Sequence, residues 1–287
     1  MDKRLSGVWT SQSTKYILIM VLTSILWSSG GILIKLVNVG PMAVSGLRSI
    51  IAAAIIFIYV KKPKFTWSLY QILGAVAYAS MAITFVAATR LTTSANAVLL
   101  QYTAPIYVAI LGSYILRERV ALKDWITISV TLIGVVLFFL DSFSLGGLMG
   151  NILAIASGFC FALFIVCSRQ QKEGSPMETI LLGNIVTAVV SMPFVINTNY
   201  DMTSIVGIAS LGIIQFGIPY VLYGIAIKHI SALDAVMIAA IEPILNPIWV
   251  LIFWGEKPGA WAILGGIIVL AAVTYNCIQS TAKKLPM

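Results

Sequence analysis

One acidic residue, Glu242, lies deep inside an apolar run, in the stretch AAIEPILNPIWVLIFWGEKP at residues 239–258. A carboxylate at the depth of a membrane core is costly, so it is expected to face the protein interior or a wet cavity. It suits a counter-charge for a cation, a proton-coupling group, or both. The alternative is a structural carboxylate that only bonds neighbouring helices.

Prolines accompany this carboxylate and recur in an earlier apolar run. Pro243 cannot donate a hydrogen bond to the carbonyl of Ala239, and Pro105 likewise frees the carbonyl of Gln101. Irregular backbone at membrane depth is tolerated where it packs against protein or lines a cavity. We therefore predict hinges at Pro105, Pro243 and Pro247, with static kinks that serve packing as the alternative.

Aromatic and amide side chains form a second group of candidates. Aromatic faces beside a carboxylate suit an ammonium group, and they equally suit stacking against an aromatic ligand. Amides beside them suit hydrogen bonds to a ligand, with contacts between helices as the alternative. We predict a small-molecule site lined by Glu242, Trp27, Tyr102, Tyr220, Gln101, Gln215, Tyr78, Tyr223 and Asn246. A wider aromatic set, for which packing or lipid contact is the alternative, adds Tyr107, Phe161, Phe216 and Trp249.

Several other charged residues lie toward the ends of apolar runs. We interpret Lys35 and Arg48 as side chains that extend to the headgroups, the alternative being attraction of an anionic ligand. Glu118 and Glu256 are candidate gating residues, with ion pairs to the adjacent Arg117 and Arg119 or to Lys257. Solvated helix ends are the favoured alternative for both. The single histidine has no metal-ligand partners in the sequence, so we expect neither a metal nor a cofactor.

The composition predicts the elements that must position these residues. The chain has 287 residues, of which 60% are hydrophobic and 10% charged, and its mean hydropathy is +0.99. That is too little charge to cover a water-facing surface, and apolar stretches of about 20 residues recur. We predict an all-α integral membrane protein. The net charge of +8 resides in short loops, so we expect no nucleic-acid partner.

Ten spans are predicted, and turn residues support the breaks between them. The spans cover residues 15–37, 43–60, 68–89, 94–116, 124–141, 149–168, 177–196, 203–227, 232–254 and 260–280. With the N-terminus inside, fourteen lysines and arginines lie in inner segments against two, Arg90 and Lys257, in outer ones. Both termini are therefore predicted to be cytoplasmic, in a multi-pass protein of the cell membrane.

The chain also repeats itself. Pro105 and Glu118 are 13 residues apart, and so are Pro243 and Glu256. A repeat of five helices enters the membrane with opposite polarity the second time, an architecture found in secondary transporters. We predict an N-terminal arm at 1–14, a first repeat at 15–141, a second at 149–280 and a tail at 281–287.

These motifs resemble the drug/metabolite transporter superfamily, specifically its ten-helix members with two EamA-type repeats. The resemblance rests on LWSSGGILIK (26–35), GLRSIIAAAIIF (46–57), TAPIYVAILGSYILRER (103–119) and IEPILNPIWVLIFWGEK (241–257). It implies a transporter without a nucleotide motor that moves small metabolites by alternating access. It does not identify the cargo.

Two expectations about cargo stay open. In the first, an amine, cationic or zwitterionic, amino-acid-like metabolite is matched to Glu242 and the aromatic residues. In the second, a neutral metabolite or drug is exported, and Glu242 is structural or binds a proton. A channel or an intramembrane enzyme is a remote alternative, because the sequence has no Walker loop, metal cluster or nucleophile elbow. Glycines in the spans 124–141 and 260–280 also suggest a homodimer contact, with packing inside one chain as the alternative.

Overall fold

Helices form every regular element in the described part of the chain. The computed structural model describes residues 12–30, 33, 37–92, 94–140, 147–171, 176–254 and 259–283, and it contains no strand in those ranges. A helix satisfies its own backbone hydrogen bonds, which the hydrocarbon core of a membrane demands. By length and composition, seven helical segments can cross a membrane: Pro41–Val60, Leu69–Ala88, Asn96–Leu116, Leu148–Gln170, Pro176–Ile196, Met202–Ala226 and Ala260–Gln279.

The helices follow the predicted spans, but several spans are divided into shorter pieces. The first half contains α2 (Gln12–Trp27), α4 (Pro41–Val60), α5 (Leu69–Leu91), α6 (Ser94–Gln101), α7 (Ala104–Leu111), the π-helix η2 (Gly112–Leu116) and α8 (Leu122–Phe138). The second half contains α9 (Leu148–Gln170), α10 (Pro176–Ile196), α11 (Met202–Ser210), the π-helix η4 (Leu211–Gly217), α12 (Ile218–Ala226), α13 (Ala232–Ala239), α14 (Ile241–Trp254) and α15 (Ala260–Lys283). The count of ten spans stays a prediction.

Local sequence explains where several helices begin. Ser68 and Ser231 stand before α5 and α13, and each hydroxyl accepts a hydrogen bond from a backbone N–H three residues on. Asp124 accepts a bond from the backbone N–H of Ala121 at the start of α8. Proline at the first position of α4 needs no donor there. These caps satisfy backbone groups that a helix leaves open at its N-terminus.

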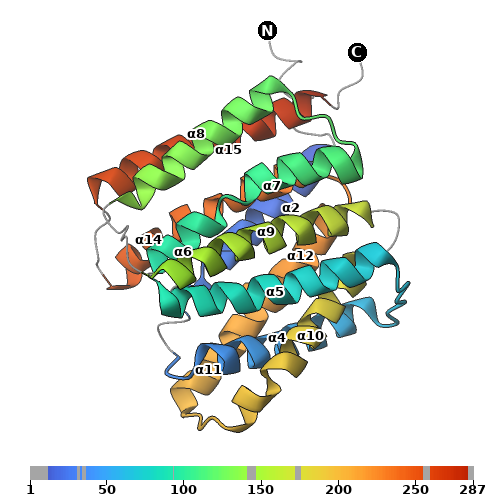
Figure 1. Ribbon diagram of the computed structural model, residues 1–287, viewed down its shortest axis with the longest axis vertical. Coiled ribbons are helices and arrows are strands. Elements are labelled where there is room, and N and C mark those ends of the chain that lie inside the picture. The colour runs from blue at the N-terminus through green and yellow to red at the C-terminus, as the bar shows by residue number, and fades with distance from the viewer. Residues whose placement is uncertain are drawn as a thin grey trace.

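The long helices lie side by side, as Figure 1 shows, with the α8–α15 pair at one end of the view. The most extensive contacts join α5 to α9, α4 to α10 and α8 to α15, and α12 packs on α2. Large side chains that are almost completely buried fill the interior between these helices, among them Tyr78, Phe164 and Tyr223. The protein therefore has a close-packed centre to which α2, α5, α9 and α12 all contribute.

The α8–α15 contact depends on glycines. A Cβ at Gly265 would lie 2.4 Å from the carbonyl oxygen of Gly134 and 2.4 Å from the backbone nitrogen of Phe138. Gly134 in turn faces the backbone of Gly265. These two glycines thus serve close helix approach within one chain, and they give no support to the homodimer contact that the sequence suggested.

We expect Gly265→Ala to destabilise the protein by about 1–3 kcal/mol, because the added methyl meets backbone atoms that cannot move aside. Thermal unfolding in detergent, followed by tryptophan fluorescence, measures the effect. Gly266→Ala is the matched control: there the nearest atom to an added Cβ is a side-chain methyl of Ile244, at 3.2 Å. Equal unfolding temperatures for the two variants would contradict this account of the α8–α15 contact.

Candidate functional site

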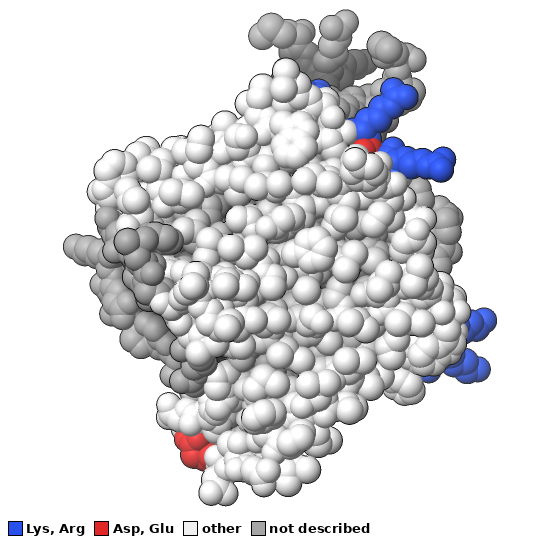
Figure 2. All heavy atoms as spheres, viewed as in Figure 1, with Lys and Arg blue, Asp and Glu red and all other residues white. Residues whose placement is uncertain are grey.

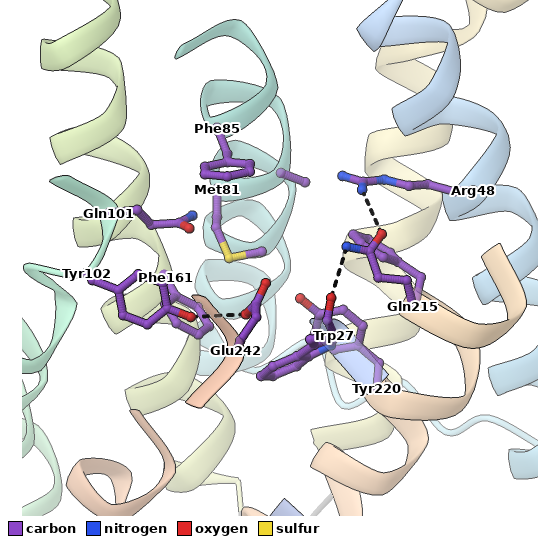
Figure 3. A pocket seen from close by; sticks show the side chains of 12 residues that line it. Trp27, Arg48, Met81, Phe85, Gln101, Tyr102, Phe161, Gln215, Tyr220 and Glu242 are labelled. Carbon is purple, nitrogen blue, oxygen red and sulfur yellow. Dashed lines mark hydrogen bonds between the residues drawn. The ribbon is translucent and has the colours of Figure 1, made fainter. Parts of the chain in front are cut away.

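A cavity lies at the centre of the helical bundle. Including its open part, it has an empty volume of about 570 Å³. Helices from both halves of the chain line it, with a carboxylate and a guanidinium among mostly aromatic side chains (Figure 3). The lining residues are Trp27, Arg48, Met81, Ala82, Phe85, Gln101, Tyr102, Phe161, Gln215, Phe216, Tyr220 and Glu242.

Glu242 projects into this cavity from the start of α14. The helix is interrupted at Ala240, between α13 and α14, because Pro243 has no backbone N–H to donate to the carbonyl of Ala239. The Ala239 carbonyl, for which Pro243 supplies no N–H, receives a bond from the Tyr102 hydroxyl at 3.0 Å. The same hydroxyl lies 3.1 Å from Oε2 of Glu242. A side chain from the first half of the chain thus stabilises the helix interruption in the second half.

A second helix interruption, between α6 and α7, positions Tyr102. Tyr102 lies in this turn, ahead of Pro105, where the hydroxyl of Thr103 caps the carbonyl of Leu100. Gly158 of α9 lets this turn approach closely, since a Cβ there would lie 2.6 Å from the carbonyl oxygen of Gln101. The Gln101 amide also donates to the Ser157 hydroxyl at 2.8 Å. The two proline-associated breaks therefore meet beside the cavity.

Arg48 approaches the cavity from the other side, beside Gln215 (Figure 3). Only 5% of Arg48 is exposed, so the interpretation that it extends to the lipid headgroups is wrong. Gln215 and Phe216 belong to the π-helix η4, and π-helical turns often occur at functional sites. The guanidinium lies over the Phe216 ring, with its central carbon 3.9 Å from the ring centroid.

Aromatic rings form much of the cavity wall. Trp27 lies 5.3 Å from Tyr220 and 6.5 Å from Phe161, measured between ring centroids. Tyr220 also contacts Tyr78 edge to face, at 4.9 Å. Such tilted and edge-to-face pairs are favourable and hold one another in position. These ring pairs help to hold the aromatic part of the cavity wall in place.

Six of the predicted site residues line the cavity: Glu242, Trp27, Tyr102, Tyr220, Gln101 and Gln215. Tyr78 and Tyr223 do not line it. Both are completely buried, and the Tyr78 hydroxyl donates to Asn184 at 3.2 Å. Asn246 and Pro247 lie within α14, but their side chains fall outside the described part of the structure, and so does all of Glu256.

Four lining residues were not predicted from the sequence as part of the site, and two others were named only in the wider aromatic set. Met81, Ala82 and Phe85 follow Tyr78 in α5 at spacings of three, four and seven residues, which puts them on one helical face. That periodicity was the available signal. Arg48 is the fourth: it was absent from the predicted site, and attraction of an anionic ligand was only the alternative interpretation. Phe161 and Phe216 were members of the wider aromatic set.

Glu118, a predicted gating residue, makes its ion pair with a different cation from those expected. Arg117 and Arg119 are exposed, whereas Nε of Arg169 lies 3.3 Å from Oε1 of Glu118. Arg169 also donates to the carbonyls of Ile227 and Lys228, just past the end of α12. The second Glu118 oxygen accepts from the backbone N–H of Ala232 at the start of α13. We call these five groups the Glu118 cluster.

The residues that line the cavity are suited to binding a small molecule. A carboxylate among aromatic faces attracts an ammonium group. Within the described residues, no group of three histidines, cysteines or acidic residues could hold a metal ion. A bundle of apolar helices around a central polar cavity is the general form of a membrane protein that binds and moves a small molecule.

The chain belongs to the EamA-like transporter family, whose model matches residues 14–140 and again residues 148–277. It is therefore a membrane transporter and not an enzyme. An uncharacterized transporter of Archaeoglobus fulgidus is 28% identical over 66% of this chain and 69% of its own length. A probable amino-acid metabolite efflux pump of Salmonella typhimurium is 20% identical over 89% of this chain and 92% of its own.

Two further proteins are similar to this chain. The threonine/homoserine exporter of Salmonella typhimurium is 25% identical over 61% of this chain, and the match spans 60% of that exporter's length. A solved crystal structure superposes with a TM-score of 0.80 at 16% identity, covering 95% of this chain and 99% of the other. At that identity the structural likeness shows the fold alone.

Proposed function

We propose that the protein is a secondary-active carrier that moves a small, amino-acid-like metabolite with an ammonium group by alternating access. The observation that carries this proposal is the position of Glu242 among aromatic side chains, in a cavity shared by both halves of the chain. Two relatives, named as a probable amino-acid metabolite efflux pump and a threonine/homoserine exporter, support the same class of cargo.

We propose that the two halves are inverted repeats. Under the shift that places Pro105 on Pro243, α5 corresponds to η4 and α12, and α6–α7 correspond to α13–α14. The contacts then occur in related pairs: α5 with α9 and α12 with α2, and likewise α7 with α9 and α14 with α2. The contacts α4–α10 and α8–α15 each join corresponding helices. This pairing is what a two-fold relation between the halves requires.

We propose that the protein spans the cell membrane (plasma or inner) with both termini in the cytoplasm. The exposed basic residues Lys61, Lys62, Lys64, Arg117 and Arg119 follow α4 and η2, whose ends are predicted to be cytoplasmic. The lysines and arginines visible in Figure 2 gather toward the right-hand edge of that view. Segregation of basic side chains to one face is typical of the cytoplasmic side.

Counterflow in proteoliposomes tests the proposed function. Vesicles that contain the purified protein are preloaded with one unlabelled L-amino acid, and uptake of the same labelled amino acid is measured across a panel. We expect saturable uptake that the internal amino acid stimulates for at least one member. A steady, non-saturating current without exchange would instead indicate a channel.

A neutral metabolite or drug is the second candidate cargo. One observation favours it: the Tyr102 hydroxyl at 3.1 Å gives Glu242 a partner within the protein. The aromatic wall would bind an apolar molecule equally well. In that case counterflow of a neutral solute persists when Glu242 is replaced by glutamine.

A further inference from the structure

Arg48 combines burial, positive charge and a place in the cavity wall. It lies in the third turn of α4 and is 5% exposed. Within the described residues, no carboxylate forms an ion pair with it, and the Glu118–Arg169 pair lies elsewhere. A cation buried away from water without a counter-ion is unfavourable. Such a group needs either a structural partner or a ligand that supplies the opposite charge.

The structural partners of Arg48 are weak. A guanidinium carries five N–H donors in a planar fork. Among the described residues Arg48 forms one hydrogen bond, from Nη1 to Oε1 of Gln215, and at 3.4 Å it is long. The Nε–H is buried and has no partner. The ring of Phe216 offsets part of the charge but accepts no strong hydrogen bond.

A second donor in the cavity wall is also unused. The indole Nε1 of Trp27 is buried without a hydrogen-bond partner. Trp27 and Arg48 both line the cavity, and the Gln215 amide contacts both, through its Oε1 to Arg48 and its Nε2 to the Trp27 carbonyl at 3.5 Å. Buried donors left without acceptors cost free energy, so this side of the cavity is suited to an acceptor from outside the protein.

We propose that Arg48 binds the carboxylate of the transported molecule and thereby selects zwitterions over simple amines. This rests on the proposed function, in which Glu242 binds the ammonium group. A planar guanidinium matches a carboxylate with paired hydrogen bonds, which a neutral amide cannot reproduce. Figure 3 shows Glu242 beside Tyr102 and Arg48 beside Gln215, so opposite charges face the cavity from different helices.

Charge balance supports this assignment. Among the described residues that line the cavity, one is a carboxylate, Glu242, and one is a guanidinium, Arg48. A zwitterion pairs both of them and adds no net charge to a low-dielectric site. A simple amine would pair Glu242 but leave Arg48 unpaired beside a second cation, and like charges at such a site repel strongly. Arg48 would therefore determine specificity, whereas Glu242 would serve every ammonium compound.

Binding to matched ligand pairs tests the proposal. The probes are the L-amino acids and their primary amides, which keep the ammonium group and lose the carboxylate charge. Thermal-shift titration of the purified full-length protein gives an affinity for each. We expect the wild type to bind an amino acid more tightly than its amide. Arg48→Gln should lower the affinity for the amino acid by about tenfold to a hundredfold. The affinity for the amide should change by less than about threefold in the same variant.

Two further variants make every outcome decisive. Glu242→Gln should lower the affinities for the amino acid and for the amide by similar factors. Arg119→Gln, which alters an exposed arginine, should leave both affinities unchanged. If Arg48→Gln does not fold, the wild-type preference for acid over amide and the behaviour of Arg48→Lys still test the inference. If the wild type binds amide and acid equally, the Arg48 inference fails and the proposed function stands. If no amino acid or amide stabilises the wild type, both fail.

Discussion

Glu242→Gln is expected to remove counterflow of ammonium-bearing solutes while leaving the folded protein intact. The ionised carboxylate supplies a charge-assisted contact to the ammonium group, which is worth about 2–3 kcal/mol. Its loss corresponds to a fall in affinity of about 30-fold to 150-fold. Glutamine keeps the shape of the side chain, and its amide can donate to the Tyr102 oxygen, so the contact at 3.1 Å can persist. Binding assays and counterflow measure the first effect, and thermal unfolding measures the second.

Glu178→Gln is the matched control for this variant. Glu178, like Glu242, is a glutamate in the first turn of a helix, but it is buried in α10 and accepts from the backbone N–H of Lys64. We expect its replacement to leave counterflow unchanged. Full retention of ammonium binding by Glu242→Gln would contradict the counter-charge role and favour the neutral cargo.

The geometry at Tyr102 suggests a link between substrate binding and protons. A tyrosine hydroxyl has one hydrogen, yet it lies within bonding distance of both the Ala239 carbonyl and the Glu242 carboxyl. Both contacts are satisfied when Tyr102 donates to Ala239 and a protonated Glu242 donates to Tyr102. Ammonium binding requires the ionised form, so we propose that proton and substrate compete for Glu242. Substrate affinity should then fall as the pH falls, and Glu242→Gln should remove that dependence.

Local signals in the sequence located one side of the cavity. A carboxylate and prolines inside apolar runs are anomalies at any depth of a membrane, so Glu242 and the breaks near Pro105 and Pro243 could be found without a structure. The aromatic candidates were harder to separate. Tyr220 lines the cavity, while Tyr223, three residues on in the same helix, is buried behind it. Helical spacing alone does not decide between a ring that faces a cavity and one that packs in a core.

The other side of the cavity depends on tertiary structure. Arg48 was judged by its position near the end of a predicted span, but α4 begins at Pro41 and packs against η4, which buries the side chain. The π-helix η4 also changes which residues of its segment point inward, so a period of 3.6 does not predict where Gln215 and Phe216 face. For Glu118, the nearest cations in sequence were the natural partners. Arg117 instead adopts a left-handed backbone, with φ of 55°, and is exposed.

The Glu118 cluster is a candidate gate, because it joins elements from both halves of the chain at one end of the bundle. Glu118 follows η2 in the first half, and Arg169, the carbonyls after α12 and the N–H of α13 belong to the second. The positive charge lies at the C-terminal end of α12 and the negative charge at the N-terminal end of α13, which suits both helix dipoles. We propose that this cluster closes the cytoplasmic side in the conformation described here.

Arg169→Gln is therefore expected to shift the protein toward a conformation that is open to the cytoplasm. The ion pair alone is partly exposed, with side-chain accessibilities of 15% and 25%, so it contributes less than about 1 kcal/mol. The two bonds from Arg169 to backbone carbonyls add charge-assisted terms of about 1.5 kcal/mol or more each. Loss of about 1.4 kcal/mol changes the ratio of two conformations tenfold, so a shift of at least about tenfold is expected.

Thiol labelling from the cytoplasmic side measures this shift. Ala82→Cys places a reporter in the cavity wall, in a protein from which Cys160, Cys167 and Cys277 have been removed. Arg169→Gln should accelerate labelling by an impermeant maleimide in inside-out vesicles by at least about tenfold. Glu118→Gln should act more weakly, because the amide still accepts from Ala232, and Arg119→Gln, at an exposed arginine of the same segment, should have no effect. Equal labelling in all three would mean that the Glu118 cluster holds the helices together without gating the cavity.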